Sequence, residues 1–255
     1  MFRALMFAGG LLFALTACGD NFSAVQKTDT IDAYEAYLKE NPDSRWVLQA
    51  NDRLETLYLE KAREEKSLAS YDAYLERFPQ GKLRAKALGE REEFLFDWAK
   101  HEDSMASWTK FLDEYPKADK KRKKQAERMI EVHEYLDKVT LSEARQKQVN
   151  MAENPKGPLD GWGFEVDVTN NGDEPIVDMR LQITFLSPEG GALRTKEWPV
   201  VAPKFPVPME EEAKVPIAPG ETRTWWWTDG AIPERWLEQK KVKLKVTRIT
   251  RGKGK

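Results

Sequence analysis

The sequence predicts a protein whose α and β structure lie in separate domains, with helical hairpins in the N-terminal part and an antiparallel β-sandwich in the C-terminal part. Two observations predict this fold class. A pattern of aromatic residues, leucine and proline recurs three times at a step of 37 residues between residues 31 and 116. After residue 160, apolar and polar residues alternate. Repeats of about 20 to 50 residues are typical of stacked supersecondary units, and alternation is typical of half-buried strands.

The three copies of the repeat begin at Ile31, Leu68 and Met105, and each reaches a proline eleven residues later. The residue before a proline is pushed out of helical conformation, so each copy should be a short helix, a break and a longer helix. Three such hairpins can share one core, which predicts a repeat domain over residues 29–137. The expected helices are 30–41, 45–66, 68–78, 82–101, 105–115 and 120–136.

The leading aromatic residue of each copy, Tyr34, Tyr71 or Trp108, has two interpretations. These side chains could line a groove that binds a partner. They could equally form the core, and an aromatic stripe at helical spacing is normally buried. The core is the favoured interpretation.

The repeats have a recognisable motif, which consists of an aromatic residue, an aromatic-Leu pair, a proline and a later small residue. It resembles the tetratricopeptide-like repeats of bacterial envelope lipoproteins, such as the helical lipoprotein of the outer-membrane barrel assembly machine and the Tol-Pal accessory protein. The resemblance implies a curved groove that binds another envelope protein or a peptide. The third copy departs from the motif, because Lys124 takes the place of Ala50 and Ala87, so it could instead be a cap. The matching residues are Tyr34, Tyr37, Leu38, Pro42, Ser44, Ala50, Leu54, Tyr71, Tyr74, Leu75, Pro79, Ala87, Trp108, Phe111, Leu112 and Pro116.

The N-terminus reads as an export signal. Arg3 precedes an apolar run over residues 4–15 that is too short to span a bilayer comfortably. The run ends in Leu15-Thr16-Ala17-Cys18, which resembles the lipobox of bacterial lipoproteins. This resemblance implies cleavage of a signal peptide over residues 1–17 and acylation of Cys18 with palmitate or a similar chain. The alternative is an ordinary signal peptide with an incidental cysteine.

The expected lipid anchor predicts where in the cell envelope the protein lies. Residues 18–28 would form a short polar, lipidated tether, and several acyl chains hold a protein on a membrane stably. By resemblance to enterobacterial lipoproteins, Gly19 rather than Asp after the cysteine favours the outer over the inner membrane, facing the periplasm or the cell surface. Cys18 is the only cysteine, so no internal disulfide can form.

Composition argues against several function classes. The 41 Lys and Arg nearly cancel the 43 Asp and Glu, so no basic field favours nucleic acid. The two histidines are far apart in sequence, which leaves little material for a metal site. No nucleophile motif, phosphate loop or paired carboxylates appear. We therefore expect no enzyme, catalytic residue, cofactor or small-molecule substrate.

One charge run stands out: Lys120, Lys121, Arg122, Lys123 and Lys124. At a helix start it opposes the helix dipole, a cost that a function could offset. Anionic lipid or an acidic partner would suit these side chains. The alternative, a solvated helix face, is the commoner case.

The C-terminal domain is expected over residues 138–255, with strands at 139–147, 162–169, 179–185, 192–201, 213–217, 222–228 and 241–250. Short strands separated by turn signals indicate a sandwich. The segments 165–172, 177–181 and 218–222 resemble immunoglobulin-like domains of bacterial exported proteins, which implies a spacer or adhesion module. Residues 199–216 read as a long surface loop.

Three consecutive tryptophans lie on one of these strands. Alternation sends Trp226 to one face and Trp225 and Trp227 to the other. As an exposed platform, Trp225 and Trp227 could stack on glycan or peptidoglycan. An internal or covered position is favoured, because large exposed apolar patches are uncommon.

Taken together, these patterns predict a membrane-anchored lipoprotein that acts as a protein-protein interaction scaffold in the cell envelope. The alternative function is glycan or peptidoglycan binding through the tryptophan-rich sandwich.

Overall fold

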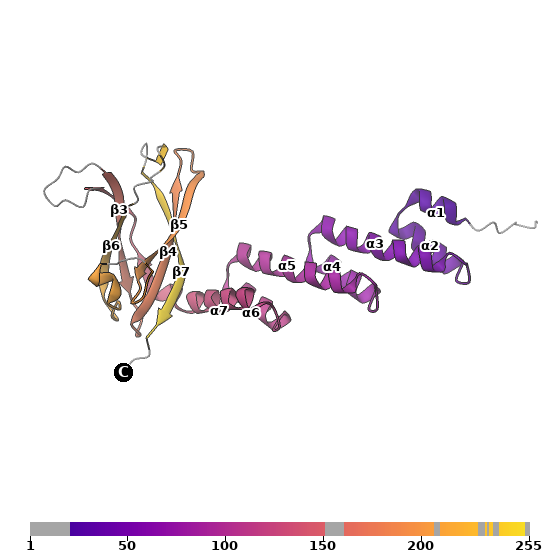
Figure 1. Cartoon of the computed structure of the whole chain (residues 1–255), viewed down its shortest axis with the longest axis horizontal. Helices are drawn as coiled ribbons and strands as arrows, with labels where there is room; N and C mark the ends of the chain where they lie inside the picture. The colour runs from indigo at the N-terminus through magenta and orange to yellow at the C-terminus, as the bar shows by residue number, and fades with distance from the viewer. Residues whose placement is uncertain are drawn as a thin grey trace, which may run out of the picture. The chain divides into compact units, whose positions relative to one another are not determined.

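The computed structural model describes residues 21–150, 161–206, 210–228, 233, 235–236 and 240–252. Cys18 and the predicted signal peptide lie outside the described residues. Helices occupy residues 22–138 and antiparallel strands residues 139–251 (Figure 1). The predicted separation of α and β structure is therefore confirmed.

The repeat seen in the sequence is also a repeat of structure. The short helices α2 (Ile31–Glu40), α4 (Leu68–Arg77) and α6 (Met105–Glu114) have ten residues each. The long helices α3 (Val47–Glu65) and α5 (Arg84–Glu102) have nineteen. The last helix, α7 (Lys120–Tyr135), has sixteen. All the expected helices are present, with ends that differ by a few residues from the sequence estimate.

The ends of the helices repeat at the same step of 37. The hydroxyls of Thr30, Ser67 and Ser104 cap the short helices by accepting a backbone N–H three residues ahead. The residue before each cap is left-handed, with φ of 48° at Asp29, 46° at Lys66 and 44° at Asp103. Side chains other than glycine rarely adopt this conformation. The chain therefore makes the same sharp turn before every short helix.

The structure corrects the expected polar tether. Residues Phe22–Thr28 form a helix, α1, in which Phe22 and Val25 are buried. The Phe22 ring stacks on the Trp46 ring, with centroids 5.3 Å apart. Phe22 and Val25 are three residues apart and so share one helix face, which covers the open end of the first hairpin.

The chain divides into two compact units, and the division falls within α5. We call residues up to Phe94 the N-terminal unit and residues from Leu95 the C-terminal unit. The core of the N-terminal unit contains aromatic and small residues of its repeated helices, including Tyr37, Tyr74, Leu54, Ala50 and Ala87.

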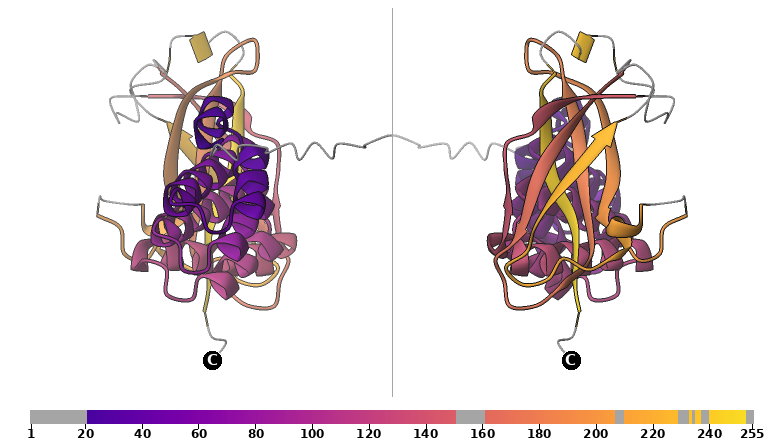
Figure 2. Two further views of the ribbon diagram at one scale, coloured as in Figure 1. Left: turned by 90° about the vertical axis from the view of Figure 1, so that its right-hand side faces the viewer. Right: turned by 90° about the vertical axis from the view of Figure 1, so that its left-hand side faces the viewer.

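The strands of the C-terminal unit form two antiparallel sheets (Figures 1 and 2). In the first sheet, β3 (Gly161–Asn170) pairs with β6 (Thr222–Thr228) on one side and with β1 (Val139–Leu141) and β2 (Arg145–Val149) on the other. In the second, β4 (Ile176–Leu186) lies between β5 (Ala192–Val201) and β7 (Val242–Arg251). Phe185 of one sheet contacts Trp227 of the other, with ring centroids 5.5 Å apart.

The expected strand over residues 213–217 is wrong. Glu211–Lys214 form a short 3-10 helix, η2, and Ile217 makes only an isolated bridge with Ile176. Pro216 has no backbone N–H to give a ladder, which explains why no strand forms there.

Within the C-terminal unit, α7 packs against β7 (Figure 1). Its buried residues are Ala126, Met129, Val132 and Tyr135. Helical spacing in the sequence predicts a different buried face, made of Ala126, Met129, Ile130, His133 and Leu136. Leu136 is in fact 37% exposed. The difference arises because α7 packs on strand β7 as well as on α6, so two faces of this helix are covered.

The junction between α7 and the sandwich is centred on Tyr135. Its hydroxyl lies 3.0 Å from Oδ1 of Asn170 and 2.9 Å from the carbonyl oxygen of Glu174. A Cβ atom on Gly172 would overlap this hydroxyl, so glycine is required there. Arg251 pairs with Glu134 of α7 at 3.2 Å. The third hairpin and the sandwich therefore belong to one compact unit.

Candidate functional site

The three repeat aromatics do not lie on the surface. Tyr34 is 2% exposed, Tyr71 6% and Trp108 1%. The indole N–H of Trp108 is also used internally, since it donates to Asp103 Oδ1 at 3.2 Å. The core interpretation is therefore confirmed, and the suggestion that these side chains contact a partner is corrected, because a partner cannot reach buried rings.

The basic run begins α7. Asp119 caps this helix, because its carboxylate accepts from the backbone N–H groups of Lys121 and Arg122 at 2.9 and 3.1 Å. That negative charge offsets the unfavourable placement of cations at a helix N-terminus. The guanidinium of Arg122 lies 5.5 Å from the centroid of the Phe96 ring. The side chains of Lys120, Lys121, Lys123 and Lys124 are exposed.

Two leucines of the described N-terminal unit are exposed: Leu48, which no sequence pattern singles out, and Leu88, which helical spacing predicts in the buried stripe of its helix. Leu48 of α3 is 81% exposed and Leu88 of α5 is 38% exposed. Leu48 lies off the buried stripe that includes Ala50 and Leu54, and that mismatch in helical spacing is the signal that could have revealed it.

The tryptophan triplet alternates as expected. Trp226 is 39% exposed, whereas Trp225 and Trp227 are 8% and 5% exposed. On the outer face, Nζ of Lys147 lies 5.3 Å from the centroid of the Trp226 ring. The covered position of Trp225 and Trp227 is confirmed, so these two side chains do not form the open platform that glycan stacking needs.

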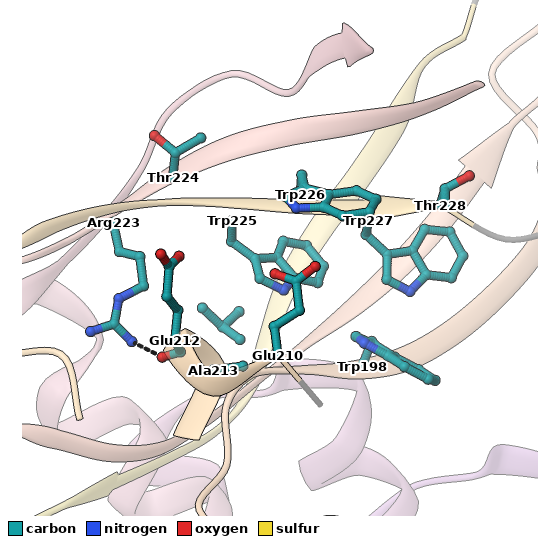
Figure 3. A pocket seen from close by; sticks show the side chains of 11 residues that line it. Trp198, Glu210, Glu212, Ala213, Arg223, Thr224, Trp225, Trp226, Trp227 and Thr228 are labelled. Atoms are coloured by element: carbon teal, nitrogen blue, oxygen red, sulfur yellow. Dashed lines mark hydrogen bonds between the residues drawn. The ribbon is translucent and has the colours of Figure 1, made fainter. Parts of the chain in front are cut away.

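Trp225 and Trp227 instead line a pocket of about 210 Å³ where the edges of the two sheets meet. Figure 3 shows both indoles extending from β6 toward Trp198 of β5, while Trp226 extends to the other side of the strand. The Trp198 and Trp227 ring centroids are 6.5 Å apart. The segment formed by η2 and the residue before it contributes Glu210, Glu212 and Ala213 to the wall.

Negative charges exceed positive charges among the groups that line this pocket. The carboxylates of Glu210 and Glu212 extend toward β6 (Figure 3), and among the described residues no cation pairs with either. Arg223 is the cation of the wall, and it is fully engaged. It donates to Glu221 Oε1 at 2.6 Å and to the carbonyl oxygens of Glu212, Val215 and Pro216. The pocket thus combines aromatic surface with two unpaired negative charges.

A second polar cluster lies on the outer face of the first sheet. Arg145 donates to both carboxylate oxygens of Asp167 at 2.7 and 3.0 Å, and Thr224 donates to the same group at 2.6 Å. These hydrogen bonds lower the pKa of Asp167 to about 2. Its donors and acceptors satisfy one another, so the cluster reads as a surface ion pair and offers no free group for chemistry.

At the junction in the C-terminal unit, Asp103 is the central charge. Burial raises the pKa of this carboxyl, but hydrogen bonds from Lys245 and Trp108 and the charge of Lys245 lower it more, so the pKa lies below its ordinary value of 3.8. His133 Nε2 lies 3.4 Å from Asp103 Oδ1. This cluster joins α7 and β7 to the turn before α6.

Among the described residues, no group of three or more His, Cys, Asp or Glu side chains could hold a metal ion. None of the helices in that part of the chain combines the length and the apolar character needed to cross a bilayer. In comparisons with known proteins, no family model, no curated protein and no solved structure matches this chain.

Proposed function

We propose that this protein is a lipid-anchored scaffold of the bacterial cell envelope, which binds another envelope protein or a peptide through its helical repeats. The observation that carries the proposal is the combination of the lipobox-like segment ending in Cys18 with three hairpins at a step of 37 residues. Stacked hairpins of this kind present long surfaces that suit protein partners.

We further propose that the hairpins are tetratricopeptide-like repeats and that the sandwich is an immunoglobulin-like module, which acts as a spacer or a second contact. An outer-membrane position facing the periplasm or the cell surface follows from Gly19 after the predicted acylated cysteine.

The burial of the repeat aromatics changes which side chains a partner would meet. Leu48 and Leu88 are the exposed large apolar side chains of the described N-terminal unit, and the lysines of residues 120–124 are exposed in the C-terminal unit. Apolar anchors contribute most to protein interfaces, whereas exposed charges mainly guide association. We therefore assign the main contact to the surface around Leu48, the more exposed of the two leucines.

Two measurements test the proposal in sequence. Radiolabelled palmitate should enter the wild-type protein and not a Cys18→Ala variant, and the variant should leave the membrane fraction. The anchored protein should then capture one defined envelope protein from solubilised membranes, and Leu48→Glu should reduce this capture. Failure of palmitate to label the wild type would contradict the anchor, and capture that is insensitive to Leu48→Glu would contradict the contact surface.

The alternative of glycan binding loses the platform on which it was based, because Trp225 and Trp227 are covered. The exposed Trp226 has Lys147 beside its ring and stands alone on its face of the sheet among the described residues. We therefore rank this alternative second.

A further inference from the structure

The pocket between β5, β6 and η2 has the features of a cation site. Three indoles from Trp198, Trp225 and Trp227 supply aromatic surface, and Glu210 and Glu212 supply negative charge. An aromatic face attracts a cation that lies within about 6 Å of the ring centroid, and tryptophan attracts it best. Carboxylates beside such rings also attract a cation, through their negative charge.

One indole of this aromatic cluster, that of Trp227, already lies beside a cation of this chain. Nζ of Lys196 lies 5.8 Å from the centroid of the Trp227 ring, and Lys147 lies beside Trp226 on the outer face. Neither lysine lines the pocket. These contacts show that the indoles accept ammonium groups at cation-π distance, while the space between Trp198, Trp225 and Glu210 is left for a ligand.

Charge complementarity gives the sign of the ligand. Arg223, the cation of the wall, forms an ion pair with Glu221 at 2.6 Å and donates to three backbone carbonyls, one of them that of Glu212, so the charge of Arg223 is already balanced by Glu221. The nearby ion pair between Lys214 and Glu211, at 2.6 Å, removes another cation. The pocket is therefore left with two negative charges that no described cation of the chain neutralises.

Volume limits the size of the ligand. The cavity of about 210 Å³ is smaller than the roughly 300–1,000 Å³ of pockets that hold drug-sized molecules. It suits one small group at the end of a longer molecule. An ammonium on an alkyl chain combines positive charge, apolar surface and small size.

We propose that this pocket binds an alkylammonium group, either a primary amine such as a lysine side chain carries or a quaternary amine such as a choline headgroup carries. The site is distinct from the helical surface assigned to the protein partner. It would give the sandwich a ligand of its own. The step is binding alone and involves no bond making or breaking.

The test is calorimetric titration of the full-length protein in a nonionic detergent at constant ionic strength. The probes are n-butylammonium, choline and 3,3-dimethyl-1-butanol, which is the uncharged isostere of choline. We expect at least one of the two cations to bind with millimolar affinity or tighter, and the neutral isostere to bind at least about tenfold more weakly. The preferred cation identifies the primary or the quaternary class.

Matched variants separate the pocket from its surroundings. The double variant Glu210→Gln/Glu212→Gln should weaken cation binding at least about tenfold, whereas Glu211→Gln, which changes the neighbouring charge outside the pocket, should change it less than about twofold. Trp198→Leu should also weaken binding without a change of charge, and circular dichroism checks that each variant is folded.

Three outcomes would overturn the inference. One is that neither cation binds, another is that the neutral isostere binds as well as choline, and a third is that the double glutamine variant binds as tightly as the wild type. Binding of an uncharged chitooligosaccharide that is lost with Trp198→Leu but kept in the double glutamine variant would assign the pocket to glycans instead. None of these results depends on acylation of Cys18 or on the protein partner, so they leave the proposed function to its own test.

Discussion

Glu55 in the N-terminal unit and Asn170 in the C-terminal unit are both buried polar side chains that join separate elements. Glu55, 5% exposed, accepts from the Tyr74 hydroxyl at 2.6 Å and from the backbone N–H of Leu83 at 2.7 Å. Asn170, fully buried, donates to the carbonyl oxygens of Glu174 and Ile217 and accepts from Gly172 N–H. Glu55 joins one repeat to the next, whereas Asn170 joins turns of the sandwich to Tyr135 of the third hairpin.

The difference shows that the third hairpin bonds to the sandwich instead of to a further repeat. Phe111 stands 37 residues after Tyr74 and has no hydroxyl to donate. In its place the third hairpin offers Tyr135 and Asp103 to the sandwich, through Asn170 and Lys245. The left-handed turn shows the same difference, since Asp29 pairs with Arg53 of its own unit at 2.7 Å and Asp103 pairs with a strand of the sandwich.

The largest expected effect follows from breaking the connection to the sandwich. Asn170→Ala removes two donated and two accepted hydrogen bonds at a fully buried site, which should lower the free energy of unfolding of the C-terminal unit by about 3 kcal/mol. Urea unfolding followed by tryptophan fluorescence measures this. Asn171→Ala, at a neighbouring exposed position, is the control and should cost less than about 1 kcal/mol. Equal losses in both variants would contradict the role of Asn170.

Breaking the connection between repeats should have a smaller effect. Glu55→Ala leaves the buried Tyr74 hydroxyl and the Leu83 N–H without their acceptor, so we expect a loss of about 2 kcal/mol, confined to the N-terminal unit. Hydrogen exchange of the α3 and α4 amides measures it. Glu55→Gln keeps an acceptor oxygen and should recover part of the loss. A loss spread equally over the sandwich amides would contradict the division into two units.

Acid should weaken the junction through Asp103. Its pKa in the folded state lies below the ordinary 3.8, so the carboxylate stabilises the fold above that pH and loses its contribution as the pH falls through the lower folded-state value. Roughly pH 5 to pH 2 is the range in which a carboxyl titrates. Over this range we expect the C-terminal unit of the wild type to lose more stability than the C-terminal unit of the Asp103→Asn variant. Thermal unfolding at several pH values measures it. Parallel pH profiles in the two proteins would contradict the account.

Substitution of Leu48 should have the smallest effect on the free energy of unfolding and the largest effect on partner binding. Leu48→Glu replaces a side chain that is 81% exposed, so stability should change by less than about 0.5 kcal/mol. Capture of the protein partner should fall several-fold, because a buried carboxylate in an apolar contact is costly. Lys61→Glu on the same helix is the matched control. A loss of stability comparable with the loss of binding would assign Leu48 to the fold instead.

The sequence predicted most of the fold because its signals are local. The step of 37, the caps at Thr30, Ser67 and Ser104, and the alternation through Trp226 all follow from residues close in the chain. The errors arose where distant contacts decide. Residues 22–28 form a helix in place of the expected tether because Phe22 packs on Trp46, and the sandwich covers Tyr135, which the helical spacing of α7 does not include in its predicted buried face.

The candidate sites were predictable to a lesser degree. Alternation placed Trp226 outside and its neighbours inside, and helical spacing placed Tyr34 and Tyr71 in the core. The aromatic-carboxylate pocket was not predictable, because its lining residues come from β5, β6 and the segment around η2, which the fold brings together from separate parts of the chain. Its charge depends on Arg223 being held by backbone carbonyls, and sequence patterns carry no signal for such contacts.

Site-specific photo-crosslinking in intact cells tests the central claim most directly, namely that an anchored N-terminal unit binds a partner with its exposed apolar surface. A photoreactive residue at position 48 should give one discrete adduct with an envelope protein. The same group at position 61 of α3 should not, because thirteen residues are about 3.6 turns and place it on a different face. Introducing Cys18→Ala should abolish the adduct. Equal adducts at both positions, or an adduct at position 48 that persists without Cys18, would contradict the account.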